Sequence, residues 1–405
     1  MHTKIDLPPE LLQAARSLSR RGFLRGTAAS GAVIAGAGLL SACGTPAAKV
    51  ASAAQSAADR SDTDKLVNFS NWPSYIDIDA KVATDHPTLD QFKKATGISV
   101  SYVEDINDNQ TFFAKIQPQL RAGQDTGRDL IVMTDWMAAR LVQQNYVQKI
   151  DHKNTPNLPG NIIAGPLHAP QWDPQRAFSA PWQSGLTGIC YDAKKTKPVR
   201  TLTDLLTRSD LKGKIAVLTE MRDTIGLIML DQGKDPANFT DDDFNAAISV
   251  LQKAKDSGQI RAFTGNEYIQ SIKKGDLVAC LAWSGDVIAM QSDRPEMTWS
   301  PPEAGVMQWA DNMLIPNKCQ HKKNAELLMN FYYDPKIAAQ LAAYVNYICP
   351  VAGAQEAMQA IDPQLAKNAL IFPTDADRAN FHSFKSLNDA DTTKYEKIFA
   401  QVTGG

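Results

Sequence analysis

The sequence lacks the features that several common classes of protein require. No apolar run approaches the roughly 20 residues of a membrane-spanning helix, since even the stretch 26–40 is short and mostly Ala and Gly. The formal net charge is only −2, which does not favour binding to nucleic acid or anionic lipid. The histidines are scattered, no phosphate-binding loop is present, and Ser184-Gly185 lacks the flanking glycine of a nucleophile elbow. We therefore expect no transmembrane span, no nucleic-acid partner, no enzymatic activity, no metal and no cofactor.

The first 43 residues carry a targeting signal. Arg20-Arg21, followed by Phe23-Leu24 and Arg25, resembles a twin-arginine export signal, and Leu40-Ser41-Ala42-Cys43 resembles a bacterial lipoprotein cleavage site. A chance dibasic pair and an ordinary core cysteine are the alternatives. We expect residues 1–43 to be a signal peptide cleaved before Cys43, with a lipid anchor on Cys43. The mature protein would then be held outside the cytoplasmic membrane.

Residues 44–63 are rich in Ala and Ser and contain no aromatic residue, so they cannot bury enough apolar surface to fold. We expect a flexible tether with a span of about 25 Å. The remaining 64–405 suffice for two domains or one large α/β unit. Without the five basic and two acidic residues of 1–43 the net charge is −5, so acidic groups inside a cleft would suit a cationic ligand.

Cysteine is scarce, and its spacing matches no zinc pattern. Beyond Cys43 the chain has only Cys190, Cys280, Cys319 and Cys349. Cys190 and Cys280 lie in strand-like segments, where buried free thiols are expected. An exported location permits disulfides, so the sequence leaves the pairing of the four open.

Alternating strand-like and helix-like segments indicate an α/β fold with a largely parallel sheet. The expected strands are 64–71, 98–103, 129–133, 185–191, 214–218 and 277–283, and the expected helices are 89–96, 112–122, 137–144 and 242–255. The stretch 156–181 is rich in Pro and Gly and predicts a boundary or surface excursion. Ligands of open α/β sheets bind outside the carboxyl ends of the strands, where this chain places aromatic and acidic residues.

Several motifs occur in an order that matches a known family. They are Val67-Asn-Phe-Ser-Asn-Trp72, Phe92-Lys-Lys-Ala-Thr-Gly97-Ile-Ser-Val100, Asp129-Leu-Ile-Val132, Pro181-Trp182, Lys212-Gly213-Lys214, Ala282-Trp283-Ser-Gly285, Trp309-Ala-Asp311-Asn-Met-Leu-Ile-Pro316 and Asn324-Ala-Glu-Leu-Leu-Met-Asn-Phe331. Over 64–352 the chain resembles extracytoplasmic solute-binding proteins of ABC importers, specifically the spermidine/putrescine-binding branch.

The resemblance implies a type II periplasmic-binding fold, in which two α/β lobes are joined by two crossings and close on a ligand between them. The crossings would lie near 182–185 and 309–316. Lobe one would be 64–183 plus 308–352, and lobe two 184–307 plus 353–405. A polyamine would be the ligand and an ABC permease in the membrane the partner, and the protein would act as a monomer.

The chemistry of a polyamine suits the residues that the resemblance assigns to the site. Carboxylates hold ammonium groups, and flat aromatic rings give contact area and a negative face for cations, at about 0.5–2 kcal/mol each. The implied walls are Trp72, Tyr75, Trp136, Trp283 and Trp309. The implied polar contacts are Glu220, Asp223, Asp311 and the hydroxyl of Thr134.

Each of these residues also has a structural alternative. The aromatic rings could pack in the core or anchor loops, Glu220 and Asp223 flank Arg222 and could be an ordinary acidic pair at a helix start, and Asp311 could cap a turn. Asp135 and Asp286 are further acids in suitable loops. The family's additional polar contact near the C-terminus has no match here, so diamines and triamines both remain open. The alternative ligand is a different cationic amine or another small solute, and an anchored enzyme is the less favoured reading.

Overall fold

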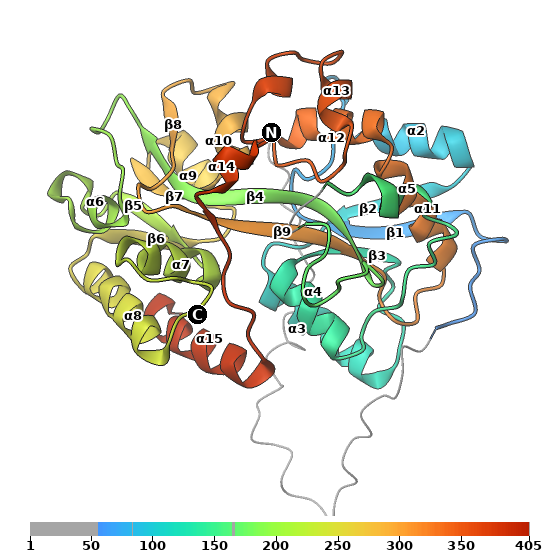
Figure 1. Ribbon diagram of the computed structural model, residues 1–405, viewed down its shortest axis with the longest axis horizontal. Coiled ribbons are helices and arrows are strands. Elements are labelled where there is room, and N and C mark those ends of the chain that lie inside the picture. The colour runs from blue at the N-terminus through green and yellow to red at the C-terminus, as the bar shows by residue number, and fades with distance from the viewer. Residues whose placement is uncertain (1–55, 83, 164–166, 405) are drawn as a thin grey trace, which may run out of the picture. The chain divides into compact units, whose positions relative to one another are not determined.

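One mixed sheet runs through the computed structural model, which describes residues 56–404 except 83 and 164–166 (Figure 1). Its main path has the order β2-β1-β3-β9-β4-β7-β5-β6, with β10 beside β9 and β8 beside β4. The strands are β1 (Leu66–Asn71), β2 (Ser99–Glu104), β3 (Leu130–Thr134), β4 (Ser179–Asp192), β5 (Ile215–Leu218), β6 (Ile260–Thr264), β7 (Ala279–Trp283), β8 (Met297–Ser300), β9 (Val306–Leu314) and β10 (Phe381–His382).

Helices flank this sheet along the whole described chain. They are α2 (Pro87–Thr96), α3 (Asn109–Ala122), α4 (Asp135–Gln143), α5 (Asn157–Asn161), α6 (Leu202–Thr207), α7 (Met221–Asp231), α8 (Asp241–Asp256), α9 (Tyr268–Lys274), α10 (Ser284–Gln291), α11 (Lys322–Tyr332), α12 (Pro335–Val345), α13 (Ala354–Met358), α14 (Asp375–Arg378) and α15 (Asp389–Thr403), with short 3₁₀ helices at Ser209–Leu211 and Leu365–Lys367. The expected alternation of strands and helices is confirmed.

Two long strands join the halves of the molecule. Strand β4 pairs with β9 over 179–187 and with β7 over 187–191, so it passes from one half of the sheet to the other (Figure 1). On the edge away from β4, strand β9 pairs with β3 over 311–314 and with β10 over 306–307. The chain therefore has the two-lobed architecture with two crossings.

The sheet is less parallel than its sequence pattern predicts. Strands β1, β2 and β3 are parallel in one half, as are β5, β6 and β7 in the other. Strands β4 and β9 run antiparallel to their main-path neighbours, because each is shared by both lobes. Strand β4 also begins at Ser179, inside the stretch expected to be irregular, and accommodates Pro181 at a shift in register against β9.

The hydrophobic core is divided between the two halves. One cluster contains Val217, Leu227, Phe244 and Leu281 around β5 and β7, and a second contains Phe69 and neighbouring side chains around β1 and β3. The ring of Trp283 borders both clusters. Each half thus has its own apolar cluster, and the halves are joined by the crossing strands and by side-chain contacts such as Asn107–Glu267 at 3.0 Å.

The end of the expected tether is fixed to the body. The backbone N–H of Arg60 donates to the carbonyl oxygen of Gln320 at 2.7 Å, and the buried hydroxyl of Ser61 accepts from the backbone of Asn324 at 3.1 Å. The sequence misses this because short polar segments can be held by hydrogen bonds to a surface without a core of their own. Residues 1–55, including the expected signal peptide and Cys43, lie outside the described residues.

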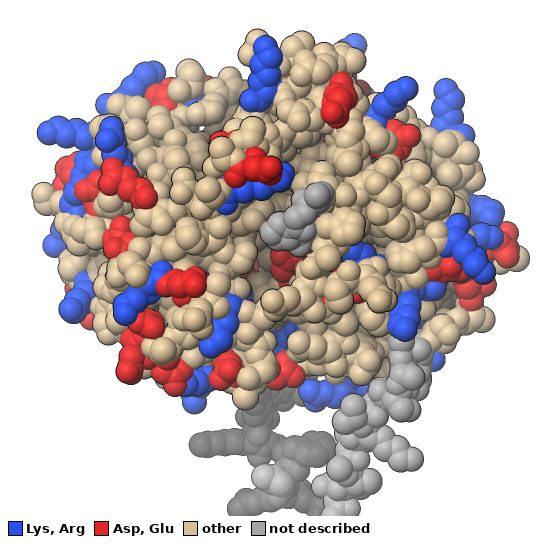
Figure 2. Space-filling view, viewed as in Figure 1, with Lys and Arg blue, Asp and Glu red and all other residues tan. Residues whose placement is uncertain are grey.

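The four described cysteines are buried, free thiols, as expected for Cys190 and Cys280. Those two stand directly opposite each other in the β4–β7 pair. Within the described part of the chain, no helix combines the length and apolar character needed to cross a membrane. On the face in Figure 2, acidic and basic side chains are interspersed without an extended basic patch.

Candidate ligand-binding site

A cavity of about 350 Å³ brings together all nine side chains that the sequence analysis singles out. Trp72, Tyr75, Thr134, Trp136, Glu220, Asp223, Trp283, Trp309 and Asp311 line it, as do Asp135 and Asp286. None of the nine lies elsewhere. The shared cavity excludes the arrangement in which Asp223 and Asp311 sit on opposite outer faces of the protein.

The topology explains this convergence. Trp72 follows β1, Thr134 ends β3, Glu220 follows β5 by two residues and Trp283 ends β7. These strands are parallel within each half, so their carboxyl ends gather at the edge where open α/β sheets bind ligands. Trp309 and Asp311 are added from the crossing strand β9.

Two of the indole rings are held in place by hydrogen bonds from their ring nitrogens to lobe residues other than the carboxylates. Trp72 donates to the carbonyl oxygen of Val132 at 3.0 Å, and Trp309 donates to the hydroxyl of Thr187 at 3.1 Å. The rings of Trp283 and Trp309 lie edge to face with centroids 6.4 Å apart. Because both rings have fixed positions, they form rigid apolar walls.

Glycine is required where these rings approach the backbone. A Cβ on Gly185 of β4 would lie 2.3 Å from a ring carbon of Trp309. A Cβ on Gly285 of α10 would lie 2.8 Å from the ring of Tyr347. Any larger residue at either position would displace an aromatic wall of the cavity.

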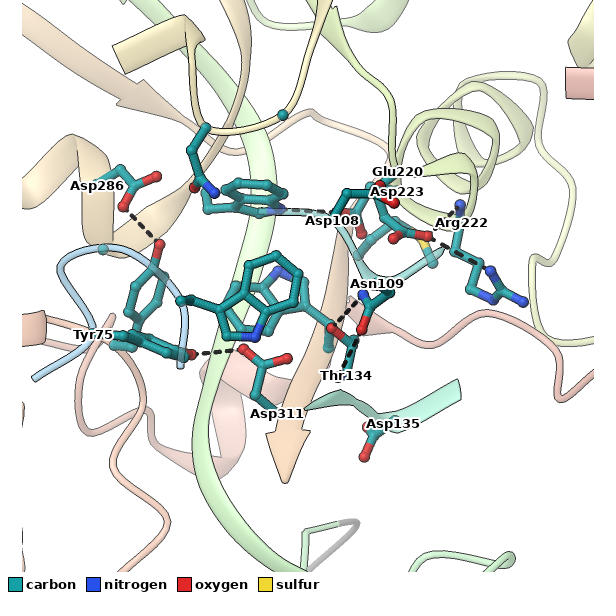
Figure 3. A pocket seen from close by; sticks show the side chains of 18 of the residues that line it. Tyr75, Asp108, Asn109, Thr134, Asp135, Glu220, Arg222, Asp223, Asp286 and Asp311 are labelled. Carbon is teal, nitrogen blue, oxygen red and sulfur yellow. Dashed lines mark hydrogen bonds and ion pairs between the residues drawn. The ribbon is translucent and has the colours of Figure 1, made fainter. Parts of the chain in front are cut away.

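Asp311 reaches the cavity from β9 with one oxygen held and the other unpartnered. Its side chain is only 5% exposed, and Oδ2 accepts a hydrogen bond from the hydroxyl of Tyr75 at 2.8 Å (Figure 3). Among the described residues, Oδ1 has no hydrogen-bond partner. A buried carboxylate oxygen without a donor is costly, so this atom is a strong candidate for contact with a bound cation.

Asp223 enters from the opposite lobe, in the first turn of α7. It is 5% exposed, and its Oδ2 accepts from the indole nitrogen of Trp283 at 2.9 Å. Glu220 is the N-cap of the same helix, where its side chain accepts from the backbone N–H of Arg222 at 3.5 Å. Glu220 and Asp223 thus form an acidic pair at a helix start, which is the structural alternative given above, and both also line the cavity.

Burial disfavours the ionised form of these acids when the cavity holds no cation. It raises the pKa of Asp223 to about 6 and that of Asp311 to about 7, against the opposing hydrogen bonds from Trp283 and Tyr75 respectively. Burial likewise raises the pKa of Glu220 to about 8, although the positive charge of Arg222 opposes the shift. A ligand that brings positive charge would compensate each carboxylate.

The two further acids are held by donors of the protein. Asp286 accepts from the hydroxyl of Tyr347 at 2.9 Å (Figure 3). It also accepts from the hydroxyl of Tyr268, and burial raises its pKa. Asp135 accepts from the amide of Asn312 at 2.7 Å. Burial raises the pKa of Asp135 to about 6. Both acids line the cavity with at least one oxygen already occupied.

The hydroxyl of Thr134 lies at the cavity wall and accepts a hydrogen bond from the amide of Asn109 at 2.9 Å. Sequence reasoning missed Asn109, Tyr347 and Arg222 as lining residues. Tyr347 follows α12 and reaches the cavity only through the fold, so no local signal identifies it. Arg222 could have been noticed, because it stands between the two acids that were selected.

Comparison with known proteins places the chain in a family. The model of the family described as "Bacterial extracellular solute-binding protein" matches residues 88–373. The spermidine/putrescine-binding periplasmic protein of Escherichia coli is 26% identical over 352 residues, which cover 86% of this chain and 94% of that protein. The putrescine-binding periplasmic protein of the same species is 27% identical over 344 residues, which cover 79% and 86%.

Solved structures show the same fold. A putative spermidine/putrescine ABC transporter protein from Listeria monocytogenes superposes with a TM-score of 0.72 at 23% identity, covering 84% of this chain and 99% of that chain. A lipoprotein of Treponema pallidum gives 0.70 at 18% identity, covering 84% and 100%. The chain belongs to the bacterial extracellular solute-binding proteins, which act outside the cytoplasm and bind solutes for ABC transporters without being enzymes.

Proposed function

We propose that this protein captures a polyamine, spermidine or putrescine, between its two lobes and delivers it to an ABC permease. The observation that carries the proposal is the meeting of Asp223 and Asp311, from different lobes, in one cavity walled by indole rings. One of the relatives from Escherichia coli is named for binding spermidine and putrescine, and the other for binding putrescine. The ligand contacts are Trp72, Tyr75, Thr134, Trp136, Glu220, Asp223, Trp283, Trp309 and Asp311.

The chemistry of the cavity supports a cation with a hydrocarbon backbone. The unpartnered Oδ1 of Asp311 accepts one ammonium group, and Asp223 accepts another from the facing lobe. The methylene groups between them pack against the rings of Trp283 and Trp309. An anion would meet mainly carboxylates here, and a neutral solute would leave them uncompensated.

Binding a ligand that touches both lobes favours their closed arrangement. The shift requires only that the closed form contact the ligand better than the open form does. The closed form then docks on the permease, and no covalent chemistry takes place.

The same proposal includes how the protein is held in place. The twin-arginine signal exports the chain, and the acylated Cys43 anchors it on the outer side of the cytoplasmic membrane as a monomer. Metabolic labelling of cells that express the protein, with radiolabelled palmitate, tests the lipid anchor. The Cys43→Ala variant should carry no label, and unchanged labelling of this variant would contradict the proposed anchor.

Calorimetric titration of the purified protein tests the ligand class. We expect saturable binding of putrescine or spermidine and none of acidic amino acids, phosphate or sugars. Binding of an anion in place of the amines contradicts the proposal. If the protein binds only a different cationic amine, the assignment of the site stands and the assignment of the ligand is wrong.

A further inference from the structure

The cavity that is lined by acids also contains one permanent positive charge. Arg222, in the first turn of α7, is the only Lys or Arg among the described residues that line it. A guanidinium remains protonated at any physiological pH. Its presence therefore changes the number of positive charges that a ligand can bring.

Arg222 is fixed on three sides. Its guanidinium carbon lies 3.6 Å from the centroid of the Trp136 ring, and Nη1 lies 3.6 Å from a carboxylate oxygen of Glu220. Nη1 also lies 3.4 Å from Oε1 of Glu396 on α15. The side chain is 9% exposed, so leaving this position would leave two partly buried carboxylates without a cation.

The position of Arg222 is the one that a ligand ammonium would need. A ring face beside a carboxylate is a good environment for an organic cation, and here the protein fills it with its own guanidinium. In Figure 3, Arg222 lies at the end of the cavity beyond Glu220, on the opposite side from Tyr75 and Asp286. Glu220 and Trp136 thus contact a ligand only beside the guanidinium, which already takes the place of an ammonium group at that end.

The remaining acids leave room for two ligand charges. Both oxygens of Asp286 accept tyrosine hydroxyls. Asp135 accepts from an amide of the protein and lies near the positive charge of Arg176. Asp108 also lines the cavity, and it caps α3 by accepting from the backbone N–H of Thr111 at 2.9 Å. Asp223 and Asp311 are left, and among the described residues each accepts from a neutral donor, Trp283 and Tyr75 respectively, and forms no ion pair. Two carboxylates without a cationic partner match two ammonium groups.

We propose that Arg222 is a specificity-determining residue, which acts as an internal cation at the Trp136–Glu220 end of the cavity and makes the protein prefer diamines to triamines. This inference rests on the proposed function, because it assigns the number of charges on the polyamine. A third ammonium would have to approach the guanidinium, and like charges in a buried site repel strongly.

Calorimetric titration at pH 8 with putrescine and spermidine tests the inference. The protein itself should bind putrescine at least tenfold more tightly than spermidine. Arg222→Gln exposes Glu220 and should shift the affinity ratio at least tenfold toward spermidine. Arg222→Lys retains the positive charge and should keep the ratio within about threefold of the starting value.

Two controls separate charge from structure. The double variant Glu220→Gln/Arg222→Gln lacks the carboxylate that would hold a third ammonium, so it should lose the gain in spermidine affinity. A purely structural role of Arg222 predicts that both affinities fall together and the ratio stays constant, which would overturn the inference. If Arg222→Gln does not fold, the single variant Glu220→Gln tests the inference instead. A selective tenfold loss of spermidine affinity in that variant would show that the third ammonium reaches Glu220 although Arg222 is present, and it would refute the inference.

The same titrations distinguish failure of the inference from failure of the proposed function. If the folded protein binds neither amine, the proposed function is wrong. If it binds both amines and prefers spermidine, or if the ratio is insensitive to Arg222→Gln, only the specificity assignment is wrong.

Discussion

Replacing Asp311 by asparagine should weaken ligand binding while it stabilises the empty protein. The substitution keeps the shape of the side chain and removes its charge. Asp311 is buried, its Oδ2 accepts from Tyr75, and its Oδ1 has no partner among the described residues. The two effects have opposite signs because the negative charge stabilises the bound ligand but destabilises the empty folded protein.

The loss of affinity follows from stranding a buried ammonium group. Removing one partner of a buried ion pair costs about 3–5 kcal/mol. At about 1.4 kcal/mol per decade, the dissociation constant for a polyamine should rise by roughly two to three and a half decades. We expect a similar loss for Asp223→Asn, which acts from the facing lobe.

The gain in stability follows from the raised pKa. Burial raises the pKa of Asp311 from 3.8 to about 7, so the empty folded state binds a proton more tightly than the unfolded state does. The free energy of unfolding therefore falls as the pH rises from about 4 to about 7, and at pH 8 the ionised side chain costs on the order of 4 kcal/mol. Asparagine avoids this cost, although its buried amide group still needs hydrogen-bond partners.

Calorimetry and thermal unfolding of the same samples at pH 8 measure both effects. Asp375→Asn is the matched control, because Asp375 is a fully exposed carboxylate that does not line the cavity and should change neither quantity. An Asp311→Asn variant that retains affinity, or that loses affinity together with a large loss of unfolding temperature, would refute the reasoning.

Further expectations concern pH, packing and mass action. Because a cation requires ionised Asp223 and Asp311, whose pKa values in the empty site are about 6 and about 7, affinity for putrescine should fall by up to about three decades between pH 8 and pH 5, and a flat profile in calorimetry would contradict the assignment. Gly185→Ala places a methyl group against the ring of Trp309, so affinity should fall with a shifted tryptophan emission spectrum, and an unchanged spectrum with unchanged affinity would show that the wall is not rigid. Ligand at 100 times its dissociation constant should raise the free energy of unfolding by about 2.7 kcal/mol, which differential scanning calorimetry measures, and no shift at saturation would mean that unfolded chain binds equally well.

Much of the fold was accessible from local patterns. The helix expected at 89–96 is found at Pro87–Thr96, and it ends at Gly97, which has a φ of 73° and is the residue that most readily forms a left-handed cap. The sequence underestimates strand β4 because Pro181 ends the stretch 156–181, whose Pro and Gly content predicts irregular structure. The register shift beside β9 that tolerates the proline depends on a partner distant in the sequence, so no local pattern could reveal it.

The sequence could predict the candidate site because several of its residues lie at the ends of strands. Trp72, Thr134 and Trp283 each follow or end a parallel strand, and the resemblance to a family selected them from other aromatic and polar residues. The contributions of Tyr347 and Arg222 depend on three-dimensional packing. Tyr347 needs the close approach of Gly285, and the role of Arg222 needs Glu396, which is 174 residues away along the chain.

A crystal structure of the putrescine complex tests the central claim most directly. We predict that one amine nitrogen lies within hydrogen-bonding distance of Asp223 and the other of Asp311, with the methylene groups between the rings of Trp283 and Trp309. A complex in which the diamine contacts only one lobe, or lies outside this cavity, would contradict the account.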